Sequence, residues 1–381
     1  MKITLVTETF PPEINGVAMT LGRLVDGLAK LDQCVTVVAP HRPDRIASKD
    51  DAFEFVSMPG CSIPRYPELK FGLPAKAKFT RLWKDNRPDI IHVATEGPLG
   101  WSAISAARKA EIPVVSSFHT NFHSYGQHYG YGFLQNMIFR WLRYCHNRCL
   151  RTFVPSEDIR TTLLEKGFEN VSILSRGVDS TLFGPHQRDP ELRQSWGASP
   201  SDPVAIYVGR LASEKNLDLV IKAYDRMRTT LPSLRLVLVG DGPARQYLES
   251  ARRDIHFAGM QEGVNLAAHY ASADCFLFGS TTETFGNVVT EAMASGTPVL
   301  AYDYAAPAKF IEHQRNGFLA PFGDSTAFLD AALDLARFHH KWNEMGSSAR
   351  AVMLPHSWSS IVHGYLQELL TISSIHGNRS F

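Results

Sequence analysis

Short apolar runs alternate with amphipathic stretches along most of the 381-residue chain. The first series of apolar runs is rich in β-branched residues and predicts buried strands at residues 2–6, 34–40, 90–95, 113–119 and 151–156. Between these runs, apolar residues recur at helical spacing over residues 16–31 and 100–110. Strands and helices that alternate in this way form parallel sheets with crossover helices.

A stretch rich in Pro, Gly and Asp near residues 177–203 separates this series from a second one. The second series predicts strands at residues 204–211, 234–242, 255–259, 274–280 and 298–303. Helices are expected between and after them, at about 216–230, 243–253, 286–295 and 325–338. A chain of this length is expected to form more than one core.

The pattern therefore predicts an α/β protein with two Rossmann-like, doubly wound domains. The predicted boundaries are residues 1–185 for the first domain and 186–355 for the second. Residues 358–372 are again apolar at helical spacing, and we expect a helix over about 356–381 that packs back onto the first domain. The default ligand site in such a protein is the cleft between two domains that face each other with the carboxyl ends of their strands.

Composition limits the classes of function. Apolar residues make up 44% of the chain, charged residues 20%, and the net charge is +1, which is typical of a soluble globular protein and gives no reason to expect nucleic-acid binding. The first residues form a predicted strand and not a signal peptide, and no run of 18 apolar residues occurs. Five cysteines without metal-type spacing predict reduced thiols in a cytoplasmic protein, with Cys145 and Cys149 as packing residues on a helix.

Two cations follow the first predicted strand of the second domain. The segment "YVGRLASEKN" places Arg210 directly after Gly209 and Lys215 five residues after Arg210. The planar fork of Arg and the point charge of Lys both suit phosphate oxygens. The alternative is a pair of solvated surface cations, which is the usual position of Lys and Arg.

Two glutamates surround a glycine turn in "STTETFGNVVTEAMASGTPV". Glu283 precedes Gly286, and Glu291 lies in the helix that is predicted to begin there. The first N–H groups of a helix have no internal partner and lie at its positive end, where they can bind a phosphate. A carboxylate on each side of a diphosphate would accept hydrogen bonds from a ribose and from a hexose, although both acids could also be solvated surface residues.

The first domain offers two further candidates. Asn15-Gly16 precedes a predicted helix, where the missing Cβ of Gly16 lets backbone N–H groups approach an anion, unless the segment is a simple turn. His119 follows a predicted strand, with His123 and His128 in the aromatic segment after it. We interpret His119 as a hydrogen-bonding group in a sugar site; a metal site is less favoured, because no Cys or carboxylate accompanies the three histidines.

In their order and spacing, these segments are similar to those of glycosyltransferase family 4. The resemblance covers nearly the whole chain, and its most specific part is the E-x7-E pair Glu283 and Glu291. It depends on residues 7–21, 116–122, 175–179, 208–224, 238–243, 257–261, 270–301 and 315–324. It implies the GT-B fold, in which two such domains face each other across a cleft, and a retaining hexosyltransferase that uses a nucleotide sugar as co-substrate, with no metal and no other cofactor.

The resemblance also implies roles for individual residues. The implied catalytic residues are His119, Arg210, Lys215 and Glu283. The implied substrate-binding residues are Asn15, Gly16, Gly209, Met260, Phe285, Gly286, Asn287, Val288 and Glu291. In this assignment Arg210, Lys215 and Gly16 hold the diphosphate, and the backbone from Phe285 to Val288 caps its distal phosphate. Glu291 binds the ribose, Glu283 the transferred sugar, and the backbone of Met260 the base.

The acceptor is indicated only weakly. Asn15-Gly16, where the family often has Gly-Gly, and "SRGVD" at residues 175–179 resemble members that act on lipids such as diacylglycerol or phosphatidylinositol. Residues 70–84 hold five cations and residues 140–151 four arginines, with no acid in either stretch. We therefore expect peripheral contact with the anionic inner face of the cell membrane, although solvated helix faces would also account for these charges.

Other functions remain open from the sequence. The two glutamates could be the acid and nucleophile of a glycosidase, but that leaves Arg210, Lys215 and the glycine loops unexplained. A nucleotide-sugar-binding module without activity, and the same transfer to a soluble or polysaccharide acceptor, are further alternatives. The donor could be GDP-mannose or a UDP-hexose, because a base bound by the backbone leaves no signal in the side chains.

Overall fold

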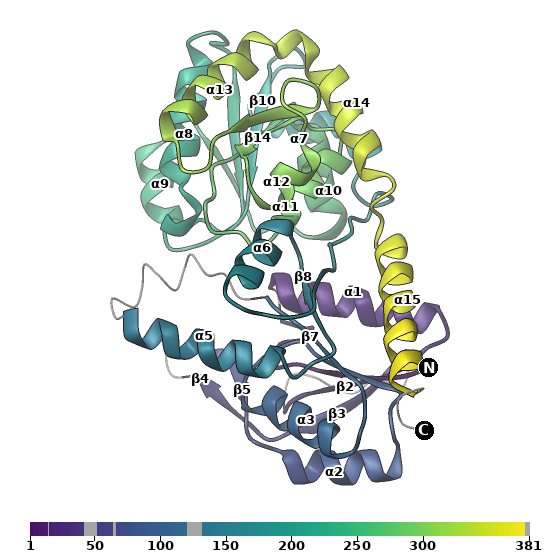
Figure 1. Cartoon of the computed structure of the whole chain (residues 1–381). Helices are drawn as coiled ribbons and strands as arrows, with labels where there is room; N and C mark the ends of the chain where they lie inside the picture. The colour runs from purple at the N-terminus through teal and green to yellow at the C-terminus, as the bar shows by residue number, and fades with distance from the viewer. Residues whose placement is uncertain (14, 42–51, 64–65, 120–131, 378–381) are drawn as a thin grey trace. The chain divides into compact units, whose positions relative to one another are not determined.

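The computed structural model describes residues 1–13, 15–41, 52–63, 66–119 and 132–377. They form two compact units (Figure 1). The first unit comprises Met1–Arg176 and Trp358–Phe381, and the second comprises Gly177–Ser357. The chain therefore passes between the units at Arg176–Gly177 and at Ser357–Trp358, where the sequence suggested boundaries near residues 185 and 355.

The first unit contains a seven-stranded parallel sheet in the order β3-β2-β1-β6-β7-β8-β9. Its strands are β1 (Lys2–Val6), β2 (Cys34–Pro40), β3 (Glu54–Met58), β6 (Ile90–Val93), β7 (Val114–Ser117), β8 (Arg151–Val154) and β9 (Val171–Ile173). A separate antiparallel hairpin consists of β4 (Gly60–Ile63) and β5 (Tyr66–Gly72). The helices are α1 (Gly16–Lys30), α2 (Lys76–Asp85), α3 (Pro98–Lys109), α5 (Gly132–His146), α6 (Glu157–Glu165) and α15 (Trp358–Gly377).

The second unit contains a six-stranded parallel sheet in the order β12-β11-β10-β13-β14-β15. Its strands are β10 (Val204–Val208), β11 (Arg235–Val239), β12 (His256–Gly259), β13 (Cys275–Phe278), β14 (Val299–Tyr302) and β15 (Gly317–Ala320). Its helices are α7 (Pro190–Ser195), α8 (Leu217–Arg228), α9 (Arg245–Ala251), α10 (Gly263–Ser272), α11 (Asn287–Ala294), α12 (Ala305–Phe310), α13 (Ser325–Arg337) and α14 (Trp342–Met353). Short 3₁₀ turns lie at Pro185–Gln187, Ser213–Lys215 and His339–Lys341.

Both faces of the first sheet are covered, which is why its strands are apolar on both sides. Ile3 and Leu5 of β1 pack in one cluster with α1 and α15. Val6 of the same strand packs in the other cluster, with Phe79 and Trp83 of α2. The alternation follows from the period of two along a strand.

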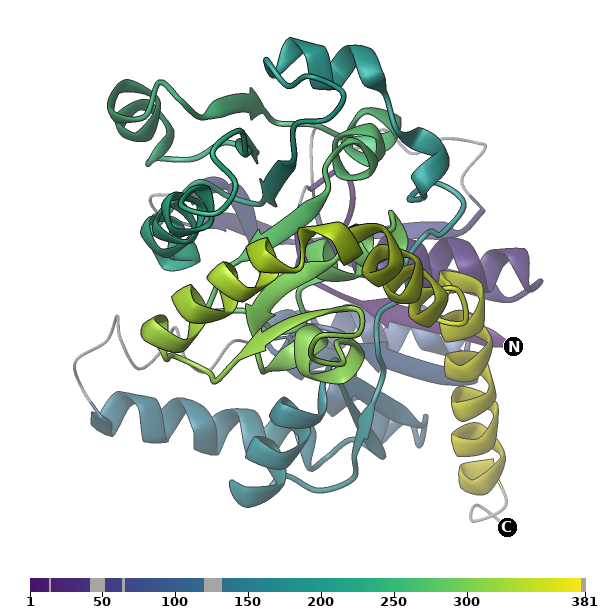
Figure 2. The ribbon, with the colours of Figure 1, turned by 90° about the horizontal axis from the view of Figure 1, so that it is seen from above.

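The last helix, α15, completes the first unit, although the whole second unit separates it in sequence. In Figures 1 and 2 it is the yellow helix beside α1. The helices are so close that a Cβ on Gly27 of α1 would lie 2.5 Å from Val362 of α15. The hydroxyl of Tyr365 lies 2.6 Å from Nδ1 of the buried His92 on β6.

The structure confirms the α/β class with two doubly wound parallel sheets. The pattern also found the central strands of both sheets. It missed the β4–β5 hairpin and the edge strands β3, β9 and β15, of which β3 is mostly half-exposed or exposed and the other two have only three and four residues. Among the described helices, none combines the length and the hydropathy that a bilayer-spanning segment needs.

Candidate functional site

The sheet of the second unit reverses its direction of growth between β10 and β13. These two strands are neighbours, with β11 and β12 on one side and β14 and β15 on the other. Such a switch point leaves a crevice at the carboxyl ends of the strands, and this is where ligands bind in open α/β sheets. Lys215 follows β10 and Glu283 follows β13, so both lie at this edge.

Three contacts join the loops that follow β10 and β13. Nζ of Lys215 lies 2.5 Å from Oε1 of Glu283. The amide of Asn216 donates to the carbonyl of Gly279 at 3.1 Å, and the hydroxyl of Thr282 donates to the carbonyl of Glu214 at 3.1 Å. The structure therefore brings together two residues that the sequence placed in separate motifs.

Glu283 is held on one side only. Its Oε1 accepts from Lys215 and, at 3.0 Å, from the hydroxyl of Ser280. Its backbone N–H donates to the hydroxyl of Tyr304 at 3.0 Å, and that hydroxyl donates to the carbonyl of Ser280 at 2.9 Å. No described residue donates to Oε2. Since the side chains of Lys215 and Glu283 are only 20% and 18% exposed, a fixed carboxylate oxygen remains available at a semi-buried position.

The helix that follows begins at a glycine in the left-handed region. Gly286 has φ +96° and directly precedes α11. Phe285 before it is fully buried, packs edge-on against Phe310, and accepts from the N–H of Ala306 at 2.9 Å through its carbonyl. The Phe285 side chain thus anchors the turn, and Phe285 itself can serve a ligand only through its backbone.

Glu291 lies within α11 and has a defined partner. The hydroxyl of Tyr270, on α10, donates to its Oε2 at 3.0 Å. Burial, and then the negative charge of Glu291, raise the pKa of Tyr270 well above its usual value. Tyr270 therefore stays protonated and orients the carboxylate.

Gly209, Arg210 and Met260 lie at the same edge of the sheet but outside this cluster. Gly209 has φ +153° and lies against the ring of Tyr207, whose hydroxyl donates to the carbonyl of Arg210 at 3.2 Å. The Arg210 side chain is exposed and makes a long ion pair, 3.5 Å, with Glu214. Met260 is exposed after β12. No described contact joins Arg210 or Met260 to Lys215 and Glu283.

In the first unit, Asn15 caps α1. Its Oδ1 accepts from the N–H groups of Val17 and Ala18 at 3.1 and 2.9 Å, which is the usual action of an N-cap residue. These two N–H groups are therefore occupied, and in the described residues only that of Gly16 remains without a hydrogen bond at this end. The missing Cβ of Gly16 also makes room for Arg176, whose Nη1 would lie 3.3 Å from it.

His119 lies past the end of β7 in a small cavity that Thr20, Ser117, Arg176 and Trp358 help to line. Both of its ring nitrogens are buried and make no hydrogen bond to described residues. Burial, and then the charge of Arg176, lower the pKa of His119 well below its usual value. His119 is therefore neutral at physiological pH. His123 and His128 lie outside the described residues.

Four partners of the site were not predicted: Ser280, Tyr304, Tyr270 and Arg176. Ser280 stands at the end of a predicted strand, so its position could have indicated it. Arg176 belongs to the "SRGVD" segment, but its side chain is 95% buried beside His119 (5% exposed), which no pattern in the sequence shows. For Tyr270 and Tyr304 the sequence carries no comparable signal, because their importance depends on which loops the sheet brings together.

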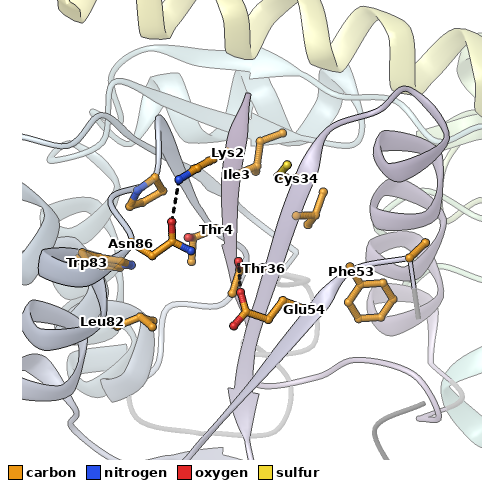
Figure 3. Close-up of a pocket in the computed structure, with 13 residues that line it drawn as sticks. Lys2, Ile3, Thr4, Cys34, Thr36, Phe53, Glu54, Leu82, Trp83 and Asn86 are labelled. Atoms are coloured by element: carbon orange, nitrogen blue, oxygen red, sulfur yellow. Dashed lines mark hydrogen bonds between the residues drawn. The ribbon is translucent and has the colours of Figure 1, made fainter. Parts of the chain in front are cut away.

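A hollow of about 510 Å³ in the first unit lies at the amino ends of its strands, opposite the carboxyl ends that His119 follows (Figure 3). Lys2, Cys34 and Glu54, at the amino ends of β1, β2 and β3, help to line it. We do not assign it to the site, because ligands of doubly wound sheets bind at the carboxyl ends. In the described part of the chain, no group of three or more His, Cys, Asp or Glu residues is arranged to hold a metal ion.

Known families match both halves of the chain. Residues 14–182 match the family description "Glycosyltransferase Family 4", and residues 188–352 match "Glycosyl transferases group 1". A GDP-mannose-dependent alpha-mannosyltransferase of Mycobacterium tuberculosis is 32% identical over 361 residues, which cover 94% of this chain and 93% of that protein. The chain belongs to glycosyltransferase family 4. The resemblance inferred from the motifs and the prediction of a hexosyltransferase are thereby confirmed.

This family 4 glycosyltransferase is also similar to a second enzyme by sequence and to a solved structure. An alpha-monoglucosyldiacylglycerol synthase of Streptococcus pneumoniae is 27% identical over 315 residues, 79% of this chain and 71% of that protein. The structure of Anabaena HepE in complex with UDP matches with a TM-score of 0.75 at 20% identity and covers 97% of this chain and 100% of that one. This likeness shows that the family 4 enzyme has the GT-B type of fold.

Proposed function

We propose that this glycosyltransferase moves mannose from GDP-mannose to a hydroxyl group of a membrane lipid, with retention of the anomeric configuration and without a metal ion. The donor is supported by the mannosyltransferase at 32% identity, compared with 27% for the glucosyl enzyme. The lipid acceptor is supported by the name of the glucosyl enzyme, which contains diacylglycerol. A soluble or polysaccharide acceptor is the alternative.

The observation that carries this proposal is the Lys215–Glu283 pair at the switch point. When the bond between the sugar and the diphosphate breaks, negative charge grows on the distal phosphate. The Lys215 ammonium and the N–H groups after Gly286 are fixed positive groups that can oppose this charge. Because Oε1 of Glu283 is already engaged, its Oε2 is the oxygen that accepts from a hydroxyl of the transferred sugar.

The remaining residues receive the roles that the family resemblance implies. Glu291, oriented by Tyr270, binds the ribose. Arg210 adds a mobile cation to the diphosphate, and Gly209 and the backbone of Met260 adjoin the nucleotide. From the first unit, the N–H of Gly16 and the neutral ring of His119 serve the diphosphate and the transferred sugar, with Asn15 holding the backbone around Gly16.

We further propose that the acceptor attacks on the face from which the nucleotide departs. The bond between C1 of the sugar and the diphosphate oxygen breaks, and its electron pair stays on the diphosphate. The acceptor oxygen forms the new bond to C1, and its proton passes to a phosphate oxygen. Glu283 is the carboxylate that a double displacement would use, but we assign its open Oε2 to a sugar hydroxyl and not to C1, which favours this single transfer over two successive displacements.

The direct test is a transfer assay with defined substrates. Purified enzyme is incubated with GDP-mannose or UDP-glucose and with diacylglycerol, phosphatidylinositol or a soluble glycoside, and the product is analysed by mass spectrometry and NMR. We expect mannose in α-linkage on a lipid, and a rate unchanged by EDTA. Transfer only to the soluble acceptor would reject the proposed lipid acceptor. Release of sugar from a glycoside in an assay that contains no nucleotide would reject the whole reaction class.

Lys215→Ala tests the role of the ion pair. If Lys215 acts mainly on the departing diphosphate, kcat should fall roughly 100-fold or more, while the Kd for GDP-mannose changes by less than about tenfold. Lys222→Ala, at an exposed position of α8, is the matched control and should leave both values unchanged. An equal loss in kcat and in donor affinity would assign Lys215 to ground-state binding only.

A lipid acceptor implies that the enzyme works at a membrane surface, and we propose peripheral association with the cytoplasmic face of the cell membrane. This follows the basic stretches at residues 70–84 and 140–151. Cell fractionation with and without a high-salt wash tests it, because an enzyme held by charge should leave the membrane fraction at high ionic strength.

A further inference from the structure

The two basic helices of the first unit differ in what they expose. On α2, Lys76, Lys78, Arg81 and Lys84 face solvent, whereas Phe79 and Trp83 are buried and stack on each other at 4.9 Å. On α5 two aromatic residues lie outside: Trp141 and Tyr144 are each 43% exposed, and Met137 is 52% exposed. Only α5 of these two helices therefore presents both charge and apolar surface.

Three exposed side chains of α5 form one stripe. Met137, Trp141 and Tyr144 recur at spacings of four and three, which places them on the same side of a helix. Arg148, four residues further on, places its guanidinium 3.4 Å from the centre of the Tyr144 ring. Figures 1 and 2 show α5 as an outer helix of the first unit.

The stripe is fixed by contacts with α3. Trp101 of α3 lies 5.2 Å from Trp141 and 5.3 Å from Tyr144, measured between ring centres, and the two α5 rings lie 5.9 Å apart. The three rings therefore hold one another in place while two of them stay exposed. Tyr and Trp suit the boundary between water and lipid, because one end of each ring is apolar and the other is polar.

The charged side chains that α5 itself carries have one sign, although Glu96 lies 3.0 Å from His146 at the end of the helix. No Asp or Glu occurs between Glu111 and Glu157 in the sequence, while Arg140, Arg143 and Arg148 lie on or next to α5. Arg140 and Arg143 are exposed. A positively charged helix with exposed Trp, Tyr and Met complements an anionic lipid surface.

We propose that this face of α5, made of Met137, Arg140, Trp141, Tyr144 and Arg148, docks on an anionic lipid bilayer. The inference deepens the proposed function, since it names the surface through which the enzyme meets its lipid. The rings enter the boundary region of the bilayer, and the arginines pair with lipid phosphates. The exposed cations of α2 add only long-range attraction, because its apolar side is buried.

The test uses the full chain and sedimentation with vesicles of phosphatidylcholine alone or mixed with phosphatidylglycerol. We expect binding only to the mixed vesicles. The double variant Trp141→Ser, Tyr144→Ser should bind them at least tenfold more weakly, and Arg140→Gln roughly fivefold more weakly. Tyr247→Ser, which removes an exposed aromatic ring from the second unit, is the control and should bind like the wild type. Thermal unfolding of each variant shows that it is folded.

Three results would overturn the proposal. The first two are equal binding to both kinds of vesicle and unchanged binding of the double variant. The third is a wild type that is a dimer in solution together with a double variant that is a monomer, which would make the stripe an interface between two copies.

A parallel assay with detergent-dispersed lipid acceptor separates the docking proposal from the proposed function. The double variant should keep its transfer rate there. Vesicle binding without transfer of any sugar to lipid would reject the proposed function and leave the docking surface standing.

Discussion

At the scale of single residues, Glu8 carries a charge that the fold makes costly. It follows β1, and its Oε1 accepts from the N–H of Gly72 at a long 3.3 Å. Its carboxyl group fits only because Gly97 has no side chain, since a Cβ there would overlap it. Burial, with a smaller effect of the Glu96 charge, raises the pKa of Glu8 from 4.5 to about 7.

Glu8→Gln should therefore stabilise the protein at high pH. Between pH 4.5 and 7 the folded state holds the proton more tightly than the unfolded state, so the stability of the wild type falls as pH rises, by at most about 3 kcal/mol. Gln has no charge to bury. We expect equal melting temperatures of variant and wild type near pH 4.5 and a higher one for the variant at pH 8. Glu165→Gln, at an exposed position of α6, is the control. If the melting temperature of Glu8→Gln equals that of the wild type at every pH, the folded state does not raise the pKa of Glu8.

The sequence predicted which residues of the site are chemically suitable, but not how they pair. The two residues were assigned separately, Lys215 to the phosphate and Glu283 to the transferred sugar. Their contact depends on β10 and β13 being neighbours, which a linear pattern does not show. Likewise, the Asn15-Gly16 turn was predicted to offer several N–H groups, whereas the Asn15 side chain itself occupies two of them. The individual roles of these residues stay predictions until variants are measured.

At the scale of elements, burial decides what the sequence can show. β10 is buried at every position, so its five residues form an apolar run that stands out from the turns around it. β3 lies at the sheet edge and is mostly half-exposed or exposed, so its "EFVSM" has no clear period. β9 has only three residues. These two edge strands are therefore missed for a physical reason, because much of β3 faces water and β9 is too short to show a period, whereas the edge strand β12 was predicted from its sequence.

A variant of the turn before α11 tests whether the start of this helix matters for function. Gly286→Ala should lower the free energy of unfolding by about 1–2 kcal/mol, because a side chain disfavours φ +96°. The added Cβ has room, since its nearest neighbours would lie 3.8 Å away. If the N–H groups after Gly286 bind the diphosphate, a shifted turn should also weaken GDP binding at least tenfold in calorimetry.

Gly197→Ala provides the matched control for this change. Gly197 follows α7, has φ +71°, and a Cβ there would meet nothing within 4 Å. It should show a similar loss of stability with unchanged affinity for GDP. If both variants bind GDP like the wild type, the start of α11 does not contact the nucleotide.

At the scale of the whole molecule, the first unit depends on the end of the chain. Val362, Tyr365, Leu366, Leu369 and Ile372 of α15 are buried in the cluster that covers one face of its sheet. Each buried side chain of this size contributes roughly 1.5–3 kcal/mol, so α15 adds on the order of 10 kcal/mol before the entropy of ordering it is counted. That is comparable to the net stability of a whole domain.

A shortened chain tests this dependence. The chain leaves the first unit at Arg176 and returns at Trp358, and both residues line the same small cavity. A short Gly-Ser linker in place of residues 177–357 should therefore give a chain that folds without the second unit. We expect it to unfold cooperatively on heating, followed by circular dichroism, whereas residues 1–176 alone should lack a cooperative transition, because the apolar face of α1 and β1 stays open. Tyr365→Phe in the linked chain should lower stability by about 1–3 kcal/mol, since it leaves the buried Nδ1 of His92 without its partner. A cooperative transition in residues 1–176 alone would show instead that α15 is an addition to a domain that is already complete.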